Sequence, residues 1–372
     1  MWQHLRRPTD ALRYFHPGWF ASVMGTGILA VATAHSASFV PALKGLATIL
    51  WVFNTVLCFI LLVPWIARWV FFFDDAWADV SHPTRGPFYS TLPIGLLVLG
   101  VDFSTIGRQY IGAELAISIH QVLWIAGTLL AFFFGVLIPY KWFTSQSIPV
   151  EQTNGGWFMP PVANIVVPAS AAPLITTWGS PGLCHFMCLV AFAFLGIGFF
   201  LFLIIGVLLI GRLIYNPLPH AHLAPTLWIG LGPIGVGSLA LVRLSMTANP
   251  IFDQYITEAQ VLLRLGSLVL WGFGVWWLAT AIALTLRYLR EPFPFAMSWW
   301  AFTFPLGAYT VATYLLADAY QTAALSLFGF ALWLLLLFFW TVVLVRTGAG
   351  TYTGALLQPP PPAQPAPTSL KS

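Results

Sequence analysis

Long apolar runs recur along the whole chain and constrain its fold more strongly than any other feature of the sequence. Three of them extend over residues 46–70, 186–210 and 323–345. A helix crosses about 30 Å of hydrocarbon with about 20 apolar residues, and each run exceeds that length. Only 7% of the 372 residues are charged, whereas the share in a soluble domain is about 25%. The sequence therefore predicts an all-α membrane protein with little room for a soluble domain.

Ten segments have the length and hydropathy expected of transmembrane helices. They lie at 17–35, 46–70, 87–104, 115–140, 158–175, 184–211, 224–243, 259–288, 298–317 and 322–346. The first follows several arginines, as in a signal peptide, but it is rich in glycine and has no convincing small-residue cleavage site, so we expect it to be retained. The predicted organisation is an N-terminal segment at 1–14, a transmembrane domain at 15–346 and a Pro-rich, disordered tail at 347–372.

Basic residues are distributed unevenly between the two sides of these spans. One side holds Arg6, Arg7, Arg13, Arg68, Arg85, Lys141, Arg212, Arg287, Arg290, Arg346 and Lys371. The other side holds Lys44, Arg108 and Arg243, and Arg264 falls within a span. Because basic residues accumulate on the cytoplasmic side, both termini are predicted to be cytoplasmic, in a plasma or bacterial inner membrane. Bases scattered in this way form no stripe, which argues against a nucleic-acid partner.

Proline and glycine interrupt every second span. The interruptions are MGTG at 24–27, LPIG at 92–95, VPAS at 167–170, GPIG at 232–235 and FPLG at 304–307. We predict helix kinks at Gly25, Gly27, Pro93, Pro168, Pro233 and Pro305. The motifs recur about every 70 residues, which indicates five repeats of one broken helix followed by one unbroken helix.

A broken helix at membrane depth leaves backbone carbonyls that cannot reach bulk water. Such breaks are tolerated where other helices bury them or where they line a wet cavity. We therefore expect five helical hairpins around a central pore lined by the kinked odd-numbered helices. The alternative is that proline and glycine are simply frequent in membrane helices and relieve packing strain.

Two longer motifs resemble a known family. The stretch FHPGWFASVMGTGI at 15–28 is similar to the first-helix signature of the tellurite-resistance/dicarboxylate transporter family, and WWAFTFPLGAYTVAT at 299–313 is similar to its ninth-helix signature. That family includes fungal malate permeases, fungal sulfite exporters, bacterial tellurite-resistance permeases and plant slow anion channels. The resemblance implies a five-hairpin bundle that usually forms a homotrimer, with one pore in each subunit.

In channel members of that family a phenylalanine of the ninth helix plugs the pore. The resemblance implies that Phe304, immediately before Pro305, is this gate, with Phe302 as the alternative. Two residues that are two positions apart on a helix point about 200° apart, so only one of them can face the axis. A bulky ring beside a kink closes a pore by steric block and by excluding water.

The spans contain few carboxylates at mid-depth, which disfavours a cation pathway. Arg243 and Arg264 are predicted near the outer face, where they could attract an anion. Their alternative role is to pair with Asp102 or Asp253. Small polar residues are expected to line the path. These are Thr26, Thr91, Asn164, Ser170, Ser238 and Thr310.

Other candidate sites are weaker. His120 is expected to be a packing histidine, with a proton relay as the alternative. Cys184, His185 and Cys188 lie too close together on one helix to enclose a metal ion, so no metal is predicted. The segment DDAWAD at 74–79, with His82, leaves a membrane-embedded enzyme as an alternative of another class. No nucleotide or dinucleotide motif is present, and no cofactor is predicted.

The favoured function is therefore transport of a small anion across the membrane, without catalysis. We expect C4-dicarboxylate transport of the malate type, with an exporter or channel for sulfite, nitrate or chloride as the alternative. The sequence does not separate a channel from a proton-coupled carrier.

Overall fold

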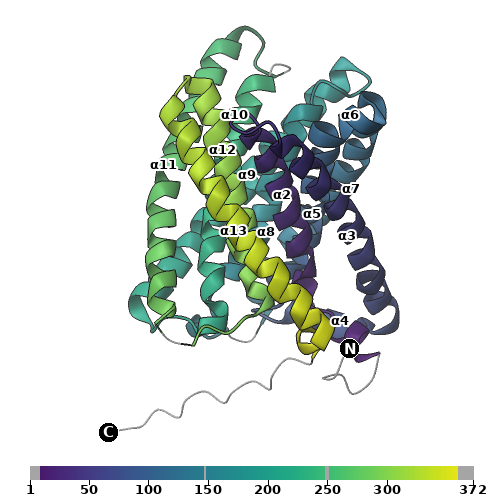
Figure 1. The fold of residues 1–372 in the computed structure, drawn as a ribbon, viewed down its shortest axis with the longest axis vertical. Coiled ribbons are helices and arrows are strands. Elements are labelled where there is room, and N and C mark those ends of the chain that lie inside the picture. The colour runs from purple at the N-terminus through teal and green to yellow at the C-terminus, as the bar shows by residue number, and fades with distance from the viewer. Residues whose placement is uncertain (1–8, 146–147, 248–250, 291, 359–372) are drawn as a thin grey trace.

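The computed structural model describes residues 9–145, 148–247, 251–290 and 292–358, and every regular element in these ranges is a helix (Figure 1). Five of the helices are long and continuous, and we call them the outer helices. They are α3 (Leu43–Phe71), α7 (Ala113–Thr144), α9 (Pro181–Tyr215), α11 (Ile256–Tyr288) and α13 (Ala323–Thr353).

Five shorter helices alternate with these along the chain, and we call them the inner helices. Each follows a 3₁₀ segment, so its first turns are wound more tightly than the rest. They are α2 (Ala21–Ser36) after Pro17–Phe20, α5 (Thr91–Asp102) after Gly86–Ser90, α8 (Met159–Ala171) after Gly155–Phe158, α10 (Leu231–Thr247) after Ala221–Gly230, and α12 (Phe304–Tyr320) after Met297–Phe302.

The remaining elements are short. They are helices α1 (Asp10–Arg13), α4 (Phe73–Ser81) and α6 (Arg108–Ile111), the π-helical turn Phe103–Gly107, and the 3₁₀ turns Val150–Gln152, Ala172–Leu174, Asp253–Tyr255 and Ala355–Leu357. Helix α13 and the turn after it extend past the predicted start of the tail at 347. Both described chain ends lie at the same end of the bundle, which is the lower end in Figure 1 and which we call the termini side.

Eight helical segments of the described chain are long and apolar enough to cross a membrane. All five outer helices are among them, together with α2, α5 and α10 and their 3₁₀ starts. The predicted spans at 158–175 and 298–317 fall on α8 and α12, which are not among these eight segments. The all-helical membrane class is confirmed, whereas the ten-span arrangement is not established.

Inner and outer helices differ sharply in burial. In the most apolar window of the segments that contain α2, α5 and α10, 83–94% of residues are buried, against 22–44% in the outer helices. Apolar side chains such as Phe59, Phe132, Val207 and Phe338 project from the outer helices. In a membrane this surface faces lipid tails or another subunit, because neither medium penalises exposed hydrocarbon.

Helix contacts explain this difference. Each inner helix packs against the outer helix that follows it in sequence, giving the pairs α2–α3, α5–α7, α8–α9, α10–α11 and α12–α13. The inner helices also touch one another in a closed cycle, in the order α2, α5, α8, α10, α12 and back to α2. We call this cycle the inner ring.

Most of the predicted proline kinks prove to be junctions between a 3₁₀ segment and an α-helix. Pro93, Pro233 and Pro305 lie in the first turn of α5, α10 and α12, where a missing N–H removes no intrahelical hydrogen bond. Pro168 differs, because it lies inside α8, within the last turn of that helix. The chain therefore changes winding before three of these prolines and avoids a break in the middle of an α-helix.

Hydroxyl side chains occupy three of these junctions. The hydroxyls of Ser22, Thr91 and Thr303 each donate a hydrogen bond of 2.7 Å to the carbonyl three residues earlier in the chain. Carbonyls at such a junction have no water to bind in hydrocarbon, so the side chain supplies the missing donor.

The kinks predicted at Gly25 and Gly27 stay a prediction, and α2 continues as an α-helix through both residues without an interruption. Their role is close packing. A Cβ atom at Gly25 would collide with Thr303. One at Gly27 would lie 2.7 Å from Asn54 Nδ2 and 2.8 Å from Asp102 Oδ2. The missing side chains let α3, α5 and the start of α12 approach the backbone of α2.

A candidate anion pathway along the inner ring

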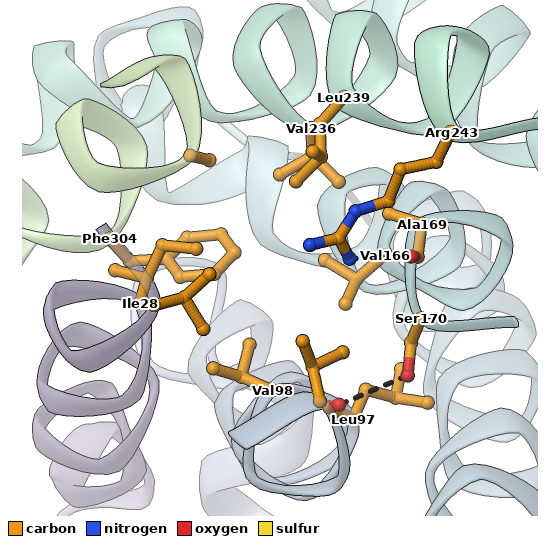
Figure 2. A pocket seen from close by; sticks show the side chains of 13 residues that line it. Ile28, Leu97, Val98, Val166, Ala169, Ser170, Val236, Leu239, Arg243 and Phe304 are labelled. Carbon is orange, nitrogen blue, oxygen red and sulfur yellow. Dashed lines mark hydrogen bonds between the residues drawn. The ribbon is translucent and has the colours of Figure 1, made fainter. Parts of the chain in front are cut away.

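A small cavity of about 30 Å³ lies inside the inner ring, and all five inner helices contribute to it (Figure 2). Its lining is almost entirely apolar. The lining residues are Ile28, Val31, Leu97, Val98, Val101, Val166, Ala169, Ser170, Val236, Leu239, Arg243, Phe304 and Ala308. We call this the central cavity.

A second cavity of about 20 Å³ lies closer to the termini side, and we call it the lower cavity. It is lined by Ala21, Met24, Phe88, Thr91, Met159, Val162, Ile229, Gly232, Met297, Trp300, Ala301, Phe304 and Pro305. Phe304 is the lining residue that the two cavities share. Its side chain is 2% exposed. The Phe304 ring therefore lies between two voids on the axis of the inner ring.

Phe302, the alternative gate, points elsewhere. Its ring stacks on Phe339 of α13 with centroids 4.9 Å apart, and it meets Trp228 edge-on at 5.4 Å. It lines neither cavity. The two phenylalanines separate because Phe302 ends the 3₁₀ segment whereas Phe304 begins the α-helix.

Arg243 of α10 extends its guanidinium toward the central cavity, opposite Phe304 (Figure 2). Its Nη1 donates a hydrogen bond of 3.0 Å to the carbonyl of Ala169 in α8. Arg243 does not form the alternative ion pair with Asp102, whose Oδ2 accepts a bond of 3.1 Å from Asn54. The Asp253 side chain lies outside the described part of the structure. No described carboxylate forms an ion pair with Arg243.

Arg264, predicted beside it, does not reach the cavity. It belongs to outer helix α11, and its Nε donates a long bond of 3.4 Å to Ser245 Oγ. The two arginines that the sequence grouped together therefore have different surroundings, and only Arg243 borders the ring interior.

Of the six small polar residues expected along the path, two line a cavity. Ser170 lines the central cavity and Thr91 the lower one. The others bond within the helix packing. These bonds are Trp340 Nε1 to Thr26 Oγ1 at 3.0 Å, Asn164 Nδ2 to the Pro160 carbonyl at 2.8 Å, Ser238 Oγ with Ser267 Oγ at 2.8 Å, and Thr310 Oγ1 to the Leu306 carbonyl at 2.8 Å.

His120 lies one layer behind the central cavity. Its Nε2 is 2.9 Å from Ser170 Oγ, and Ser170 donates in turn to the Leu97 carbonyl at 3.0 Å. The imidazole is fully buried on outer helix α7. This arrangement agrees with the packing role expected for His120, which also holds Ser170 in place at the cavity.

A much larger cavity of about 530 Å³ opens on the termini side, and we call it the vestibule. Its lining consists of Tyr14, His16, His82, Thr84, Arg85, Phe88, His222, Leu223, Phe295, Ala296, Met297, Ser298, Ala355, Leu356 and Gln358. It shares Phe88 and Met297 with the lower cavity, so the two are adjacent. Sequence reasoning missed the vestibule. The repeated His-Pro pairs at 16–17 and 82–83 are the only signal that could have indicated it.

Two carboxylates of the acidic segment at 74–79 form ion pairs. Asp79 binds both Arg68 and Arg85, and Asp75 binds Arg13 at 2.9 Å. The acidic segment had suggested an enzymatic site, and its Asp75 and Asp79 instead form ion pairs with basic residues of neighbouring elements. Among the described residues, no group of three or more potential ligands is placed to hold a metal ion.

Comparison with known proteins decides the family. The family model described as "SLAC1: Voltage-dependent anion channel" matches residues 14–348. The chain belongs to this family.

Individual proteins also match nearly the whole chain. An uncharacterized transporter of Methanocaldococcus jannaschii is 41% identical over 94% of this chain and 97% of its own length. A sulfite efflux pump of Trichophyton rubrum is 27% identical over 91% of each chain. The malic acid transport protein of Schizosaccharomyces pombe is 20% identical over 90% of this chain and 78% of its own.

Family membership confirms the resemblance found in the two sequence motifs and the class of function inferred from it. The chain is a multi-pass membrane protein of an anion transporter and channel family. The family consists of transporters and channels, in agreement with a function other than catalysis.

Proposed function

We propose that a small anion crosses the membrane along the axis of the inner ring and that the Phe304 side chain is the gate. The observation that carries this proposal is the position of Phe304 between the central and lower cavities, to which all five inner helices contribute. An apolar constriction of this kind stops ions by steric block and by excluding water.

The small size of the two cavities supports a closed conformation. A void of about 30 Å³ holds roughly one or two water molecules. An anion therefore passes only after the Phe304 ring has moved. Phe304 is the first residue of α12 and follows a change of helical winding at Thr303, so a small backbone rotation there would swing the ring off the axis.

Arg243 supplies the charge that favours anions. Its guanidinium borders the central cavity and binds a backbone carbonyl, which leaves its positive charge uncancelled by any described carboxylate. In a low-dielectric ring such a charge attracts an anion and repels a cation. Arg264 is not part of this proposal, because it borders neither cavity.

We propose the membrane arrangement predicted from the repeats: ten spans in five hairpins, with both termini cytoplasmic. Its support is the packing of each inner helix against the following outer helix and the position of both chain ends on one side (Figure 1). On this orientation the vestibule faces the cytoplasm. A homotrimer is also proposed, supported by the family resemblance and by the apolar surface of the outer helices.

For the substrate we propose a small oxyanion, with sulfite ahead of malate. From the sequence alone we expected a C4-dicarboxylate, but the sulfite efflux pump is more similar to this chain than the malic acid transport protein is. Sulfite is also the smaller ion and needs less widening of the path at Phe304. Malate stays the second candidate because of the malic acid transport protein.

Purified protein in liposomes tests this proposal. Sulfite, malate and chloride are supplied in turn, with and without a pH gradient, and flux is compared with empty liposomes. We expect sulfite flux above that of malate. Malate uptake that acidifies the lumen would indicate proton symport, and a proton-independent chloride current would indicate a channel. Folded protein that moves none of the three anions contradicts the proposal.

A further inference from the structure

The vestibule combines four nitrogen-rich side chains with a lining that contains no carboxylate among the described residues. His16, His82, His222 and Arg85 all line it. We infer that the vestibule contains an oxyanion-binding site in which His16, His82 and Arg85 donate hydrogen bonds to the ion before it meets the gate. This inference rests on the proposed function, because it assigns a cytoplasmic entry site to the same path.

Backbone hydrogen bonds determine which nitrogen of each histidine carries the proton. His16 Nδ1 accepts a bond of 2.9 Å from the Gly18 N–H. His82 Nδ1 accepts bonds of 3.1 and 3.3 Å from the N–H groups of Thr84 and Arg85. An imidazole nitrogen that accepts such a bond is unprotonated, so the proton of each neutral ring is on Nε2. Both histidines therefore present an N–H donor at the far edge of the ring.

A comparison of two repeats shows that the turn at His16 needs only a side-chain acceptor for a backbone N–H group, and an imidazole ring is not necessary for that. Residues 15–20 read FHPGWF and residues 153–158 read TNGGWF, at the starts of two repeats. Asn154 occupies the position of His16, and its Oδ1 accepts from the Gly156 N–H at 2.9 Å, the same bond that His16 makes with Gly18. Asn154 is buried and does not line the vestibule. An asparagine thus fulfils the capping role, and the extra nitrogen of His16 is available for a ligand.

The local electrostatics favour an anion. Asp79 is shared by Arg68 and Arg85, so one carboxylate faces two guanidinium groups and a positive charge remains. The pKa of His16 is lowered to about 3, first by burial and then by Arg85, Arg68 and His82. The pKa of His82 is also lowered, mainly by burial. At neutral pH these two histidines are therefore uncharged N–H donors in a positive field.

This set of donors matches the chemistry of an oxyanion. Sulfite or a carboxylate has several oxygens that each accept hydrogen bonds, and an arginine beside neutral N–H groups binds them with charge assistance. An ion held here is next to Phe88 and Met297, which also line the lower cavity beneath Phe304. The site would concentrate the substrate at the entrance of the narrow path.

Direct binding measurements on the full-length protein in detergent test the inference. Sulfite, malate and chloride are each titrated against wild type, His16→Asn, His82→Asn and the double variant. Asparagine keeps an acceptor for the backbone N–H groups and removes the Nε2 donor. We expect each single variant to weaken sulfite binding about fivefold and the double variant about twentyfold. These factors correspond to the loss of one or two hydrogen bonds to a charged ligand. His220→Asn, next to the vestibule but outside its lining, is the matched control and should bind like the wild type.

A second measurement covers the case in which a variant does not fold. In wild-type protein labelled with ¹⁵N-histidine, sulfite should shift two Nε2 signals that belong to Nε2-protonated rings. Unchanged sulfite affinity in the folded double variant, or no histidine shift at saturating sulfite, would overturn the site. Failure of the proposed function has a different signature, since the protein would then bind sulfite with His16 and His82 but move no anion across liposomes.

Discussion

The inner and outer helices show two ways of placing proline and glycine in a membrane. Outer helices α3 and α7 contain Pro64 and Pro139 and yet continue as single α-helices. In the inner helices, Pro93, Pro233 and Pro305 follow a change from 3₁₀ to α-helical winding. Proline alone therefore does not determine where a helix is interrupted. What distinguishes the inner helices is that they surround the axis and are almost fully buried.

The largest expected effect concerns glycine packing. A Cβ atom at Gly235 of inner helix α10 would lie 2.6 Å from the backbone nitrogen of Tyr309 in α12, and a backbone cannot move aside as a side chain can. We expect Gly235→Ala to destabilise the fold by about 2–3 kcal/mol, as in other overpacked interiors. A Cβ atom at Gly272 of outer helix α11 would meet no atom within 4 Å, so Gly272→Ala should be neutral or stabilising. Thermal unfolding in detergent measures the stability of both variants. An equal loss of stability in the two would contradict the difference in packing between inner and outer helices.

The proposed gate provides the next test. Phe304→Ala removes the ring that separates the central and lower cavities, so anion flux in liposomes should rise about tenfold or more. Phe302→Ala leaves that ring in place and removes a stacking partner of Phe339, so it should lower thermal stability with little change in flux. An increase in flux with Phe302→Ala and none with Phe304→Ala would reverse the assignment.

Arg243 of inner helix α10 and Arg264 of outer helix α11 allow a further comparison of inner and outer helices, with a smaller expected change in flux. Arg243→Gln keeps a donor for the Ala169 carbonyl but removes the charge beside the central cavity. We expect anion flux to fall about fivefold, more strongly at low ionic strength, where charges are least screened. Arg264→Gln, on outer helix α11, is the control and should stay within about twofold of wild type. If both substitutions lower the flux equally, the position of an arginine beside the central cavity does not matter for anion transport.

The smallest effect is a pH dependence. The pKa of His16 is lowered to about 3, mainly by burial, whereas a histidine in an unfolded chain has a pKa of about 6.5. Between these values the unfolded state binds a proton that the native state does not, so stability falls as the pH falls from about 6.5 toward 3. His16→Asn removes this contribution.

Melting temperatures of both proteins at pH 6.5 and pH 4.5 provide the measurement. The wild type should lose about 2 °C more than His16→Asn over this interval. Equal losses in the two proteins would mean that His16 becomes protonated in the native state.

Much of the architecture could be predicted from the sequence because it depends on composition and repetition. Apolar length indicates the membrane class, and the recurrence of FPLG-like motifs on alternate segments identifies the helices that form the inner ring. The two family motifs led to the anion-transport class, which the family match confirms. Phe304 was selected by its proximity to Pro305, and the structure has it lining both cavities.

The remaining features depend on contacts that no local pattern records. Gly25 and Gly27 resemble helix breakers in sequence, and their close packing against Thr303, Asn54 and Asp102 depends on other segments. Arg243 binds a backbone carbonyl, which any residue can provide, so its partner has no signature in the sequence. The vestibule assembles histidines from separate loops, and single histidines between spans look like ordinary solvent-exposed residues.

The contact between α2 and α12 has a consequence for biogenesis. These helices close the inner ring, although nearly the whole chain separates them in sequence. In the membrane arrangement proposed above, a ribosome delivers α2 to the bilayer first and α12 almost last, so the first four inner helices would lie there before the ring can close. Ile28, which packs against Gly307 in the finished protein, would meet lipid until then. Nascent chains that stall before the last hairpin should therefore be preferred targets of membrane quality control.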